Sequence, residues 1–162
     1  DGTRTGGRMG ELLALSDYFA AALALWHAIG RVGCLLEACC HGKPSRLPWA
    51  IAFTDPACSV PDILKGLPLH PTQLYEAVGE ASFFAYAALV LLPEIRAGKR
   101  PAGTVFWGWL AFYSALRFAA EFARGDDRGA LLPVLSPSQW ISLGAGSAAA
   151  IALSRRSGKT VL

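Results

Sequence analysis

Residues 12–30 read LLALSDYFAAALALWHAIG, a run of nineteen residues that is apolar almost throughout. At 1.5 Å per residue, an α-helix of this length spans about 28 Å, close to the ~30 Å of hydrocarbon in a bilayer. The run lacks the polar stripe that a surface helix of a soluble protein carries. It therefore predicts a helix that crosses a membrane.

Three further apolar blocks follow along the chain. They are LYEAVGEASFFAYAALVLL at 74–92, GTVFWGWLAFYSALRFAAEFA at 103–123 and QWISLGAGSAAAIAL at 139–153. Charged residues make up 17% of the chain, against roughly a quarter in soluble domains. We predict an all-α, polytopic transmembrane helix bundle with about four spans, forming one domain over 1–162. A soluble bundle of buried helices is the alternative.

The distribution of basic residues predicts the orientation of the bundle. Segments 1–11, 93–102 and 154–162 are short and hold eight Lys and Arg residues, whereas the longer segments 41–70 and 124–136 hold five. By the positive-inside rule, the first group is cytoplasmic and the second lies outside. The net charge of only +3 gives no indication of nucleic-acid binding.

The 41–70 connection is predicted to be an ordered extracytoplasmic loop. It contains seven Gly and Pro residues, which interrupt helices and form turns. Trp49, Ile51 and Phe53 alternate with small residues, so a short strand is expected there. After it, residues 136–139 read SPSQ, a capping-box pattern that predicts the start of the last helix.

The third block carries polar residues where polarity is costly. Tyr113, Arg117 and Glu121, with Arg124 just beyond, lie at about 0°, 40°, 80° and 20° around a helix, and so on one face. An ionisable group in hydrocarbon costs at least ~2.5 kcal/mol, so this face must meet protein or a wet cavity. Two interpretations stay open. Arg117 and Glu121 form a pair that joins helices, or the face binds an anionic headgroup through bidentate guanidinium contacts.

The second block begins in a similarly polar way. Glu76 and Glu80 share a helix face, so one is expected to be protonated or paired with an arginine. Asp17 and His27, inside the first block, are interpreted as interhelical hydrogen-bonding residues. Arg31 follows the first block and stands between glycines, which permit close helix approach or a break in the helix. It either reaches the headgroup region or contributes to a site.

Four cysteines are too few for a disulfide scaffold. The run Cys34, Cys39, Cys40, His41 does not match the C-x2-C pairs of zinc sites, nor the C-x-x-C of redox enzymes. Metal binding and redox chemistry stay open as alternatives, and packing as small apolar side chains is favoured. No metal and no cofactor are predicted.

Three segments together resemble one known family. They are GRVGCLLEACCHGKP at 30–44, HPTQLYE at 70–76 and YSALRFAAEFAR at 113–124. In this order they are similar to the motifs of prolipoprotein diacylglyceryl transferase, a seven-helix enzyme of the bacterial inner membrane. The resemblance implies transfer of a diacylglyceryl group from phosphatidylglycerol to the lipobox cysteine of a preprolipoprotein, with release of glycerol phosphate. Because the chain begins with Asp1, we expect it to be a fragment or processed form, the C-terminal part of such a protein.

The resemblance also implies roles for particular residues. The implied catalytic residues are Arg31, His70, Tyr113, Arg117 and Glu121, and the implied substrate-binding residues are Gly30, Gly33, Gly42, Gln73, Tyr75 and Glu76. The chain departs from the family pattern where Cys34 replaces the usual Asn and Cys39 a usual Glu, and no His precedes Gly6-Gly7 to give the family's His-Gly-Gly segment. The alternative is therefore an inactive relative that binds anionic phospholipid or a membrane partner.

Overall fold

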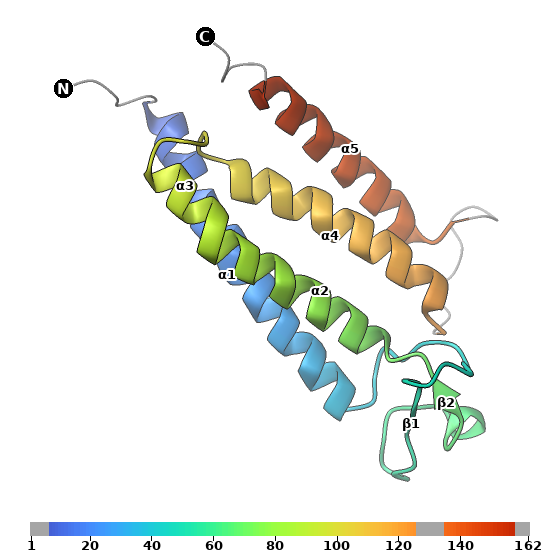
Figure 1. The fold of residues 1–162 in the computed structure, drawn as a ribbon. Helices are drawn as coiled ribbons and strands as arrows, with labels where there is room; N and C mark the ends of the chain where they lie inside the picture. The colour runs from blue at the N-terminus through green and yellow to red at the C-terminus, as the bar shows by residue number, and fades with distance from the viewer. Residues whose placement is uncertain (1–6, 126–134, 158–162) are drawn as a thin grey trace.

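Long helices dominate the computed structural model, which describes residues 7–125 and 135–157. The helical elements are α1 (Arg8–Leu36), α2 (Thr72–Tyr86), the π-helical turn η2 (Ala87–Leu91), α3 (Leu92–Arg96), α4 (Thr104–Ala123) and α5 (Pro137–Ser157). Since α2, η2 and α3 follow one another without a break, they form one long rod (Figure 1). The prediction of a mostly helical chain is confirmed, and the four apolar blocks are helical except for Gly103, which immediately precedes α4.

Helices α1 and α2 pack along each other, both contact α4, and α5 packs against α4 (Figure 1). Small side chains line the contacts, because Ala20, Ala21, Ala24 and Ala28 are the buried apolar residues of α1. Alanine lets helix backbones approach closely, as in membrane bundles. The core therefore depends on close backbone packing more than on large buried side chains.

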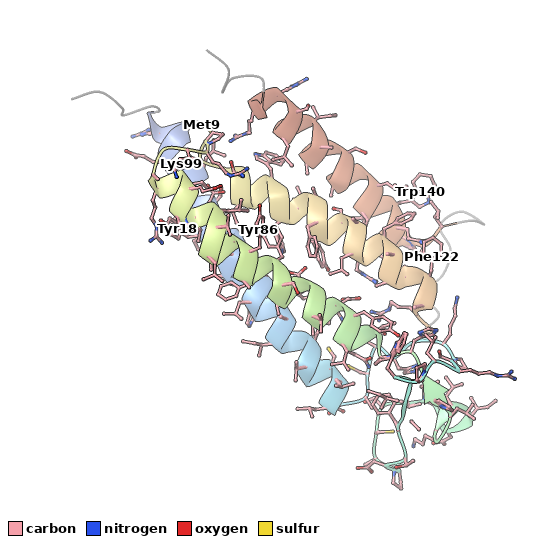
Figure 2. All side chains as sticks on the ribbon, viewed as in Figure 1. Met9, Tyr18, Tyr86, Lys99, Phe122 and Trp140 are labelled. Atoms are coloured by element: carbon pink, nitrogen blue, oxygen red, sulfur yellow. The ribbon has the colours of Figure 1, made fainter. Side chains whose placement is uncertain are left out.

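Large apolar side chains lie instead on the outside of the bundle. Figure 2 labels several of them, namely Met9, Tyr18, Tyr86, Phe122 and Trp140, all of which are exposed. Two rods, Arg8–Leu36 and Thr72–Arg96, are long and apolar enough to cross a membrane by length and composition. An apolar exterior of this extent needs lipid or another protein to cover it.

Asp17 joins α1 to the start of α4. Its carboxylate accepts hydrogen bonds from the backbone N–H groups of Gly103, at 2.6 Å, and Phe106, at 3.0 Å. The first N–H groups of a helix have no partner within the helix, and a side-chain carboxylate satisfies them. Gly103 has a left-handed φ of 88°, which glycine adopts without strain. The interhelical role expected for Asp17 is confirmed.

The 41–70 connection contains little helix. Strands β1 (Ile51–Ala52) and β2 (Pro68–Leu69) pair antiparallel with Ile51 opposite Leu69, and η1 (Asp62–Leu64) is one turn of 3₁₀-helix. Ala38, Val60 and Leu69 form a small apolar core beneath them. The expected ordered loop and short strand are both present.

The start of α5 shows the predicted capping box. The Ser136 N–H donates to Gln139 Oε1 at 3.0 Å, and the Gln139 N–H donates to Ser136 Oγ at 3.3 Å. These reciprocal bonds satisfy N–H groups that have no partner within the helix. The first turn of α5 is thereby fixed beside the end of α4, where Ser138 contributes to the site described next.

A buried arginine–carboxylate cluster as the candidate site

One buried carboxylate is shared by guanidinium groups from two helices. Glu76, whose side chain is 1% exposed, lies on the second turn of α2. Its Oε2 lies 2.5 Å from Arg31 Nε of α1, and its Oε1 lies 3.5 Å from Arg117 Nη1 of α4. Arg124, just after α4, contributes a third guanidinium, with Nη1 3.6 Å from Glu76 Oε1. The pairing with arginine expected for one of the two glutamates is therefore present.

Arg117 has further partners on α4 and α5. Its Nη2 lies 2.7 Å from Glu121 Oε2, one helical turn along α4, and donates to Ser138 Oγ at 3.3 Å. Arg117 thus pairs with Glu121 on its own helix and with Glu76 of α2, so both ion pairs belong to one cluster. Ion pairs link α1, α2 and α4, and the Ser138 hydroxyl adds α5.

The cluster lies inside the loop-side end of the bundle. Arg31 stands five residues before the end of α1, Glu76 four after the start of α2, and Arg117 six before the end of α4. At 1.5 Å per residue these positions are about 6 to 9 Å from the helix ends. Charges at that depth need partners, because removing them from water is costly.

Some hydrogen-bonding capacity in the cluster is unused within the part of the chain that the structure describes. Arg31 Nε and Glu76 Oε2 are close enough for an ion pair, yet the N–H does not point at the carboxylate in hydrogen-bonding geometry. Gln73 Oε1, also buried, has no donor. A buried polar atom without a partner indicates where a water or a polar ligand fits.

Glu80 and Tyr113 form a second polar group, one turn deeper in the bundle. Glu80 Oε2 accepts a hydrogen bond from Trp109 Nε1 at 3.0 Å, and its Oε1 lies 3.8 Å from His27 Nδ1. The Tyr113 ring stacks on Trp109 and meets the edge of the His27 ring, with centroids 5.6 and 5.2 Å apart. Ring contacts with Trp109 and His27 therefore hold Tyr113 in place, next to the arginine cluster. His27 thus contacts a glutamate of another helix, but its Nδ1 has no hydrogen-bond partner among the described residues, so the interhelical hydrogen bond expected for it is not formed there.

His70 and Tyr75 belong to a separate chain of polar contacts at the loop. The His70 Nδ1 and the Tyr75 hydroxyl oxygen lie 3.1 Å apart, and that hydroxyl accepts a bond from Trp49 Nε1 at 2.8 Å. Within residues 7–125 and 135–157 no hydrogen bond or ion pair connects His70 to Arg31 or Arg117. Of the implied catalytic residues, Arg31, Arg117 and Glu121 thus belong to the buried cluster. Tyr113 lies in the polar group around Glu80, and His70 lies at the loop.

The implied glycines divide into two kinds. A Cβ on Gly42 would lie 2.4 Å from His70 Cβ and 2.6 Å from the Ala123 carbonyl oxygen. Only glycine therefore fits between the start of α2 and the end of α4. Gly30 and Gly33 are exposed on α1, and a Cβ there would meet nothing within 4 Å. The helix also continues unbroken past both to Leu36. Neither the close helix approach nor the helix break expected at these two positions is present among the described residues.

The connection after α1 is held by the start of α2. Gln73 Nε2 donates to the Cys39 carbonyl at 2.7 Å, and Thr72 Oγ1 donates to the Cys40 carbonyl at 2.8 Å. Gln73 thus positions the loop through its amide. Burial and the neighbouring Cys34 thiol raise the pKa of Cys39 to about 12. For Cys40, burial opposes ionisation, but the hydrogen bond and positive charge of Arg124, together with contributions from Cys39 and Arg31, outweigh it and lower the pKa.

The site contains residues that the sequence interpretation did not assign to it. Arg124 shares Glu76, Ser138 accepts from Arg117, and Trp109 donates to Glu80. The helical spacing of Arg124 and Arg117 put both on one face, which was a usable signal. Ser138 and Trp109 gave none, because an isolated serine or tryptophan in an apolar block is unremarkable.

Known proteins share these segments. The family model of prolipoprotein diacylglyceryl transferase matches residues 5–155. A phosphatidylglycerol–prolipoprotein diacylglyceryl transferase of Clostridium tetani is 37% identical over 133 residues, covering 82% of this chain and 49% of that protein. One of Cupriavidus pinatubonensis is 35% identical over 138 residues, covering 84% and 46%.

The chain spans about half the length of these curated relatives. No solved structure matches it. The family match nevertheless covers nearly the whole chain and includes all three motif segments. This chain therefore belongs to the prolipoprotein diacylglyceryl transferase family.

Proposed function

We propose that this chain forms the C-terminal part of a seven-helix enzyme of the bacterial inner membrane. Four helical rods cross the bilayer, and the 41–70 loop lies outside. Two observations support this arrangement. The exterior of the bundle is apolar, and Arg96, Lys99, Arg155 and Arg156 gather at the end opposite the buried cluster. That end is the cytoplasmic one under the positive-inside rule.

We further propose that the whole enzyme transfers a diacylglyceryl group from phosphatidylglycerol to the cysteine thiol of a preprolipoprotein. The observation that supports this most is the shared use of Glu76 by Arg31 and Arg117. Guanidiniums that share one carboxylate keep N–H groups for a second anion, and phosphate oxygens match their geometry. Phosphatidylglycerol carries such a phosphate beside its diacylglyceryl group.

The chemistry follows from the charges. The acceptor thiol gives its proton to water, its sulfur forms a bond to the terminal glyceryl carbon, and the bond from that carbon to the phosphate oxygen breaks. The electron pair leaves with glycerol phosphate, whose charge increases in the transition state. Positive charge already fixed beside the phosphate stabilises that state without reorganisation. In this proposal Arg31 and Arg117 hold the phosphate, and Glu76 and Glu121 hold the arginines in place.

The test is a mass measurement on the acceptor. The 162-residue chain and the complete product of its reading frame are each incubated with phosphatidylglycerol vesicles and a lipobox peptide that contains one cysteine. We expect the complete product to add one diacylglyceryl group to the peptide. Arg117→Gln should slow this by about 10²- to 10³-fold, as loss of a donor to a developing oxyanion does. Arg155→Gln, an exposed change at the other end of the bundle, is the matched control. Absence of the adduct with the complete product, or equal loss in both variants, contradicts the proposal.

A second candidate is an inactive relative that binds anionic phospholipid or a membrane partner through the same cluster. It is favoured by one feature, the cysteines at positions 34 and 39 where the family usually has Asn and Glu. The double variant Cys34→Asn, Cys39→Glu separates the two candidates. If the complete product is inactive and this variant transfers the lipid group, the natural protein is the binding relative.

A further inference from the structure

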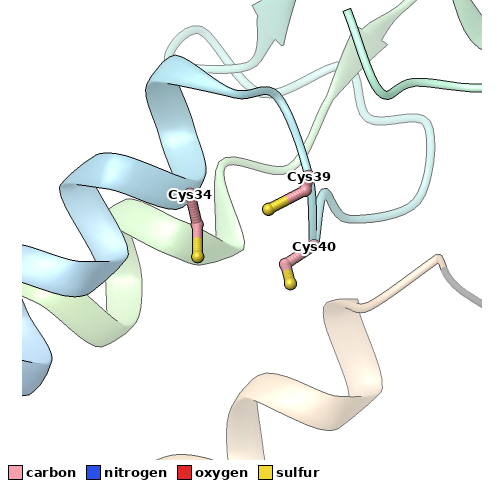
Figure 3. A group of neighbouring side chains, drawn as sticks. All are labelled: Cys34, Cys39 and Cys40. Atoms are coloured by element: carbon pink, nitrogen blue, oxygen red, sulfur yellow. The ribbon is translucent and has the colours of Figure 1, made fainter.

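Three cysteine side chains lie together beside the arginine cluster. Cys34 is on the last turns of α1, and Cys39 and Cys40 are on the connection that follows it. The three Sγ atoms all lie within 4.8 Å of one another, and all three residues are half-buried. Figure 3 shows the Cys39 side chain turned toward Cys34, with Cys40 just below Cys39. The fourth cysteine, Cys58, packs instead under the external loop.

The backbone is built to bring these sulfurs together. Ala38 and Cys40 have φ angles of 58° and 60°, in the left-handed region that non-glycine residues rarely adopt. The Cys39 N–H donates to the Cys34 carbonyl at 3.0 Å, which turns the chain back over the end of α1. The buried Gln73 and Thr72 side chains then fix the Cys39 and Cys40 carbonyls. The surrounding fold thus holds an unfavourable turn that points three thiols into one space.

The size of this space suits a thiolate-bound metal ion. With Zn–S bonds of about 2.3 Å, three sulfurs at the corners of a tetrahedron are about 3.8 Å apart, so from separations of 4.8 Å each needs to move inward by only about 0.6 Å. Small rotations about the Cα–Cβ bonds supply that movement. Three protein ligands also leave the fourth tetrahedral position open, as in catalytic zinc sites.

The charges near the thiols select the kind of ion. Arg124 hydrogen-bonds to the Cys40 side chain, and Arg31 acts on it electrostatically from one turn before Cys34. Three thiolates and a divalent ion form a complex of charge −1, which neighbouring guanidiniums stabilise. Soft thiolate ligands favour ions such as zinc over Mg²⁺ or Ca²⁺, which require oxygen ligands.

We propose that Cys34, Cys39 and Cys40 bind one thiophilic divalent cation, and that its open position takes the thiolate of an incoming cysteine. The second part rests on the proposed transferase function, and the first does not. The acceptor thiol gives its proton to water as its sulfur binds the metal. That sulfur then attacks the glyceryl carbon, and glycerol phosphate leaves with the electron pair of the broken C–O bond.

The metal site is tested on the 162-residue chain, purified in detergent and stripped of metal. Zn²⁺ titration should give one ion per chain, and Co²⁺ should give sulfur-to-metal charge-transfer absorption. Cys39→Ser should weaken binding by more than the about 10- to 100-fold that loss of an outer-shell partner costs. Cys58→Ser is the matched control and should bind as the parent does. Equal loss in both variants, or binding without charge-transfer absorption, overturns the site.

A measurement on the unaltered protein covers the case in which a variant does not fold. Zn²⁺ should protect Cys34, Cys39 and Cys40 from iodoacetamide, with Cys58 labelled at the same rate with or without the metal, as mapped by peptide mass spectrometry. Unchanged labelling of all four cysteines overturns the proposal.

The open position is tested with the Co²⁺-loaded chain and a lipobox peptide. The cysteine peptide should increase the charge-transfer absorption, and a serine peptide should not. No increase overturns the role of the fourth position. The outcomes also separate this proposal from the transferase function. If the metal-free complete product transfers the lipid group at full rate, the transferase function holds and the role of the metal is overturned. If the protein binds the metal and the peptide thiol but transfers no lipid group, the metal site holds and the transferase function is overturned.

Discussion

Replacing Glu76 by glutamine removes the negative charge that Arg31, Arg117 and Arg124 share, and it preserves the shape of the side chain. Arg117 retains Glu121 at 2.7 Å, but Arg31 loses its one ion pair within the described residues. Removing one partner of a buried pair costs about 3–5 kcal/mol, because the other charge stays buried without compensation. For a chain of this size, that corresponds to a fall in Tm of roughly 6 to 20 °C.

The assay is thermal unfolding of the detergent-solubilised chain, followed by the loss of helical circular dichroism. Glu94→Gln is the matched control, since Glu94 pairs with Arg100 on an exposed part of the molecule. Such surface pairs contribute only about 0–1 kcal/mol. The double variant Arg31→Gln, Glu76→Gln should lose less stability than the sum of the single variants, because the two residues interact. If Glu76→Gln lowers the Tm no more than Glu94→Gln, the shared-carboxylate interpretation is wrong.

Three further predictions concern other parts of the bundle. Asp17→Ala should destabilise the chain by about 0.5–2 kcal/mol, because two N–H groups at the start of α4 lose their acceptor; the same unfolding assay measures this. Gly42→Ala should cost about 1–3 kcal/mol through overpacking, whereas Gly30→Ala, which meets open space, should be neutral or stabilising. In the metal-free protein, Cys40 should react with iodoacetamide at a lower pH than Cys39. The pKa of Cys40 is lowered and that of Cys39 is raised to about 12, so the Cys40 thiolate forms first; peptide mass mapping over a pH series shows the order.

The helices were predictable because a long apolar block in lipid must satisfy its own backbone hydrogen bonds, which a helix does. The third block was expected at 103–123, and α4 runs over Thr104–Ala123. The first block was expected to end at Gly30, but α1 continues to Leu36. Glycine usually marks the end of a helix in a soluble protein, whereas in an apolar helix the lack of alternative hydrogen-bond partners keeps the backbone helical.

The charged part of the site was predictable for a similar reason, and the thiol cluster was not. Arg117 and Glu76 occur in apolar helices, where burying a charge costs free energy unless it has a partner. The two side chains are paired with each other in the structure. The cysteines are brought together by left-handed turns at Ala38 and Cys40. Neither residue type indicates such a turn, and the hydrogen bonds that hold it come from α2, more than thirty residues away. Sequence spacing alone therefore favoured simple packing.

In the proposed function, buried guanidiniums hold the phosphate of a membrane lipid. Native mass spectrometry of the complete reading-frame product, released from phosphatidylglycerol-containing detergent micelles, tests it directly. We expect one bound phosphatidylglycerol per chain in the parent and in Arg155→Gln, and loss of that lipid in Arg31→Gln and Arg117→Gln. Equal lipid retention by all four proteins would contradict the account.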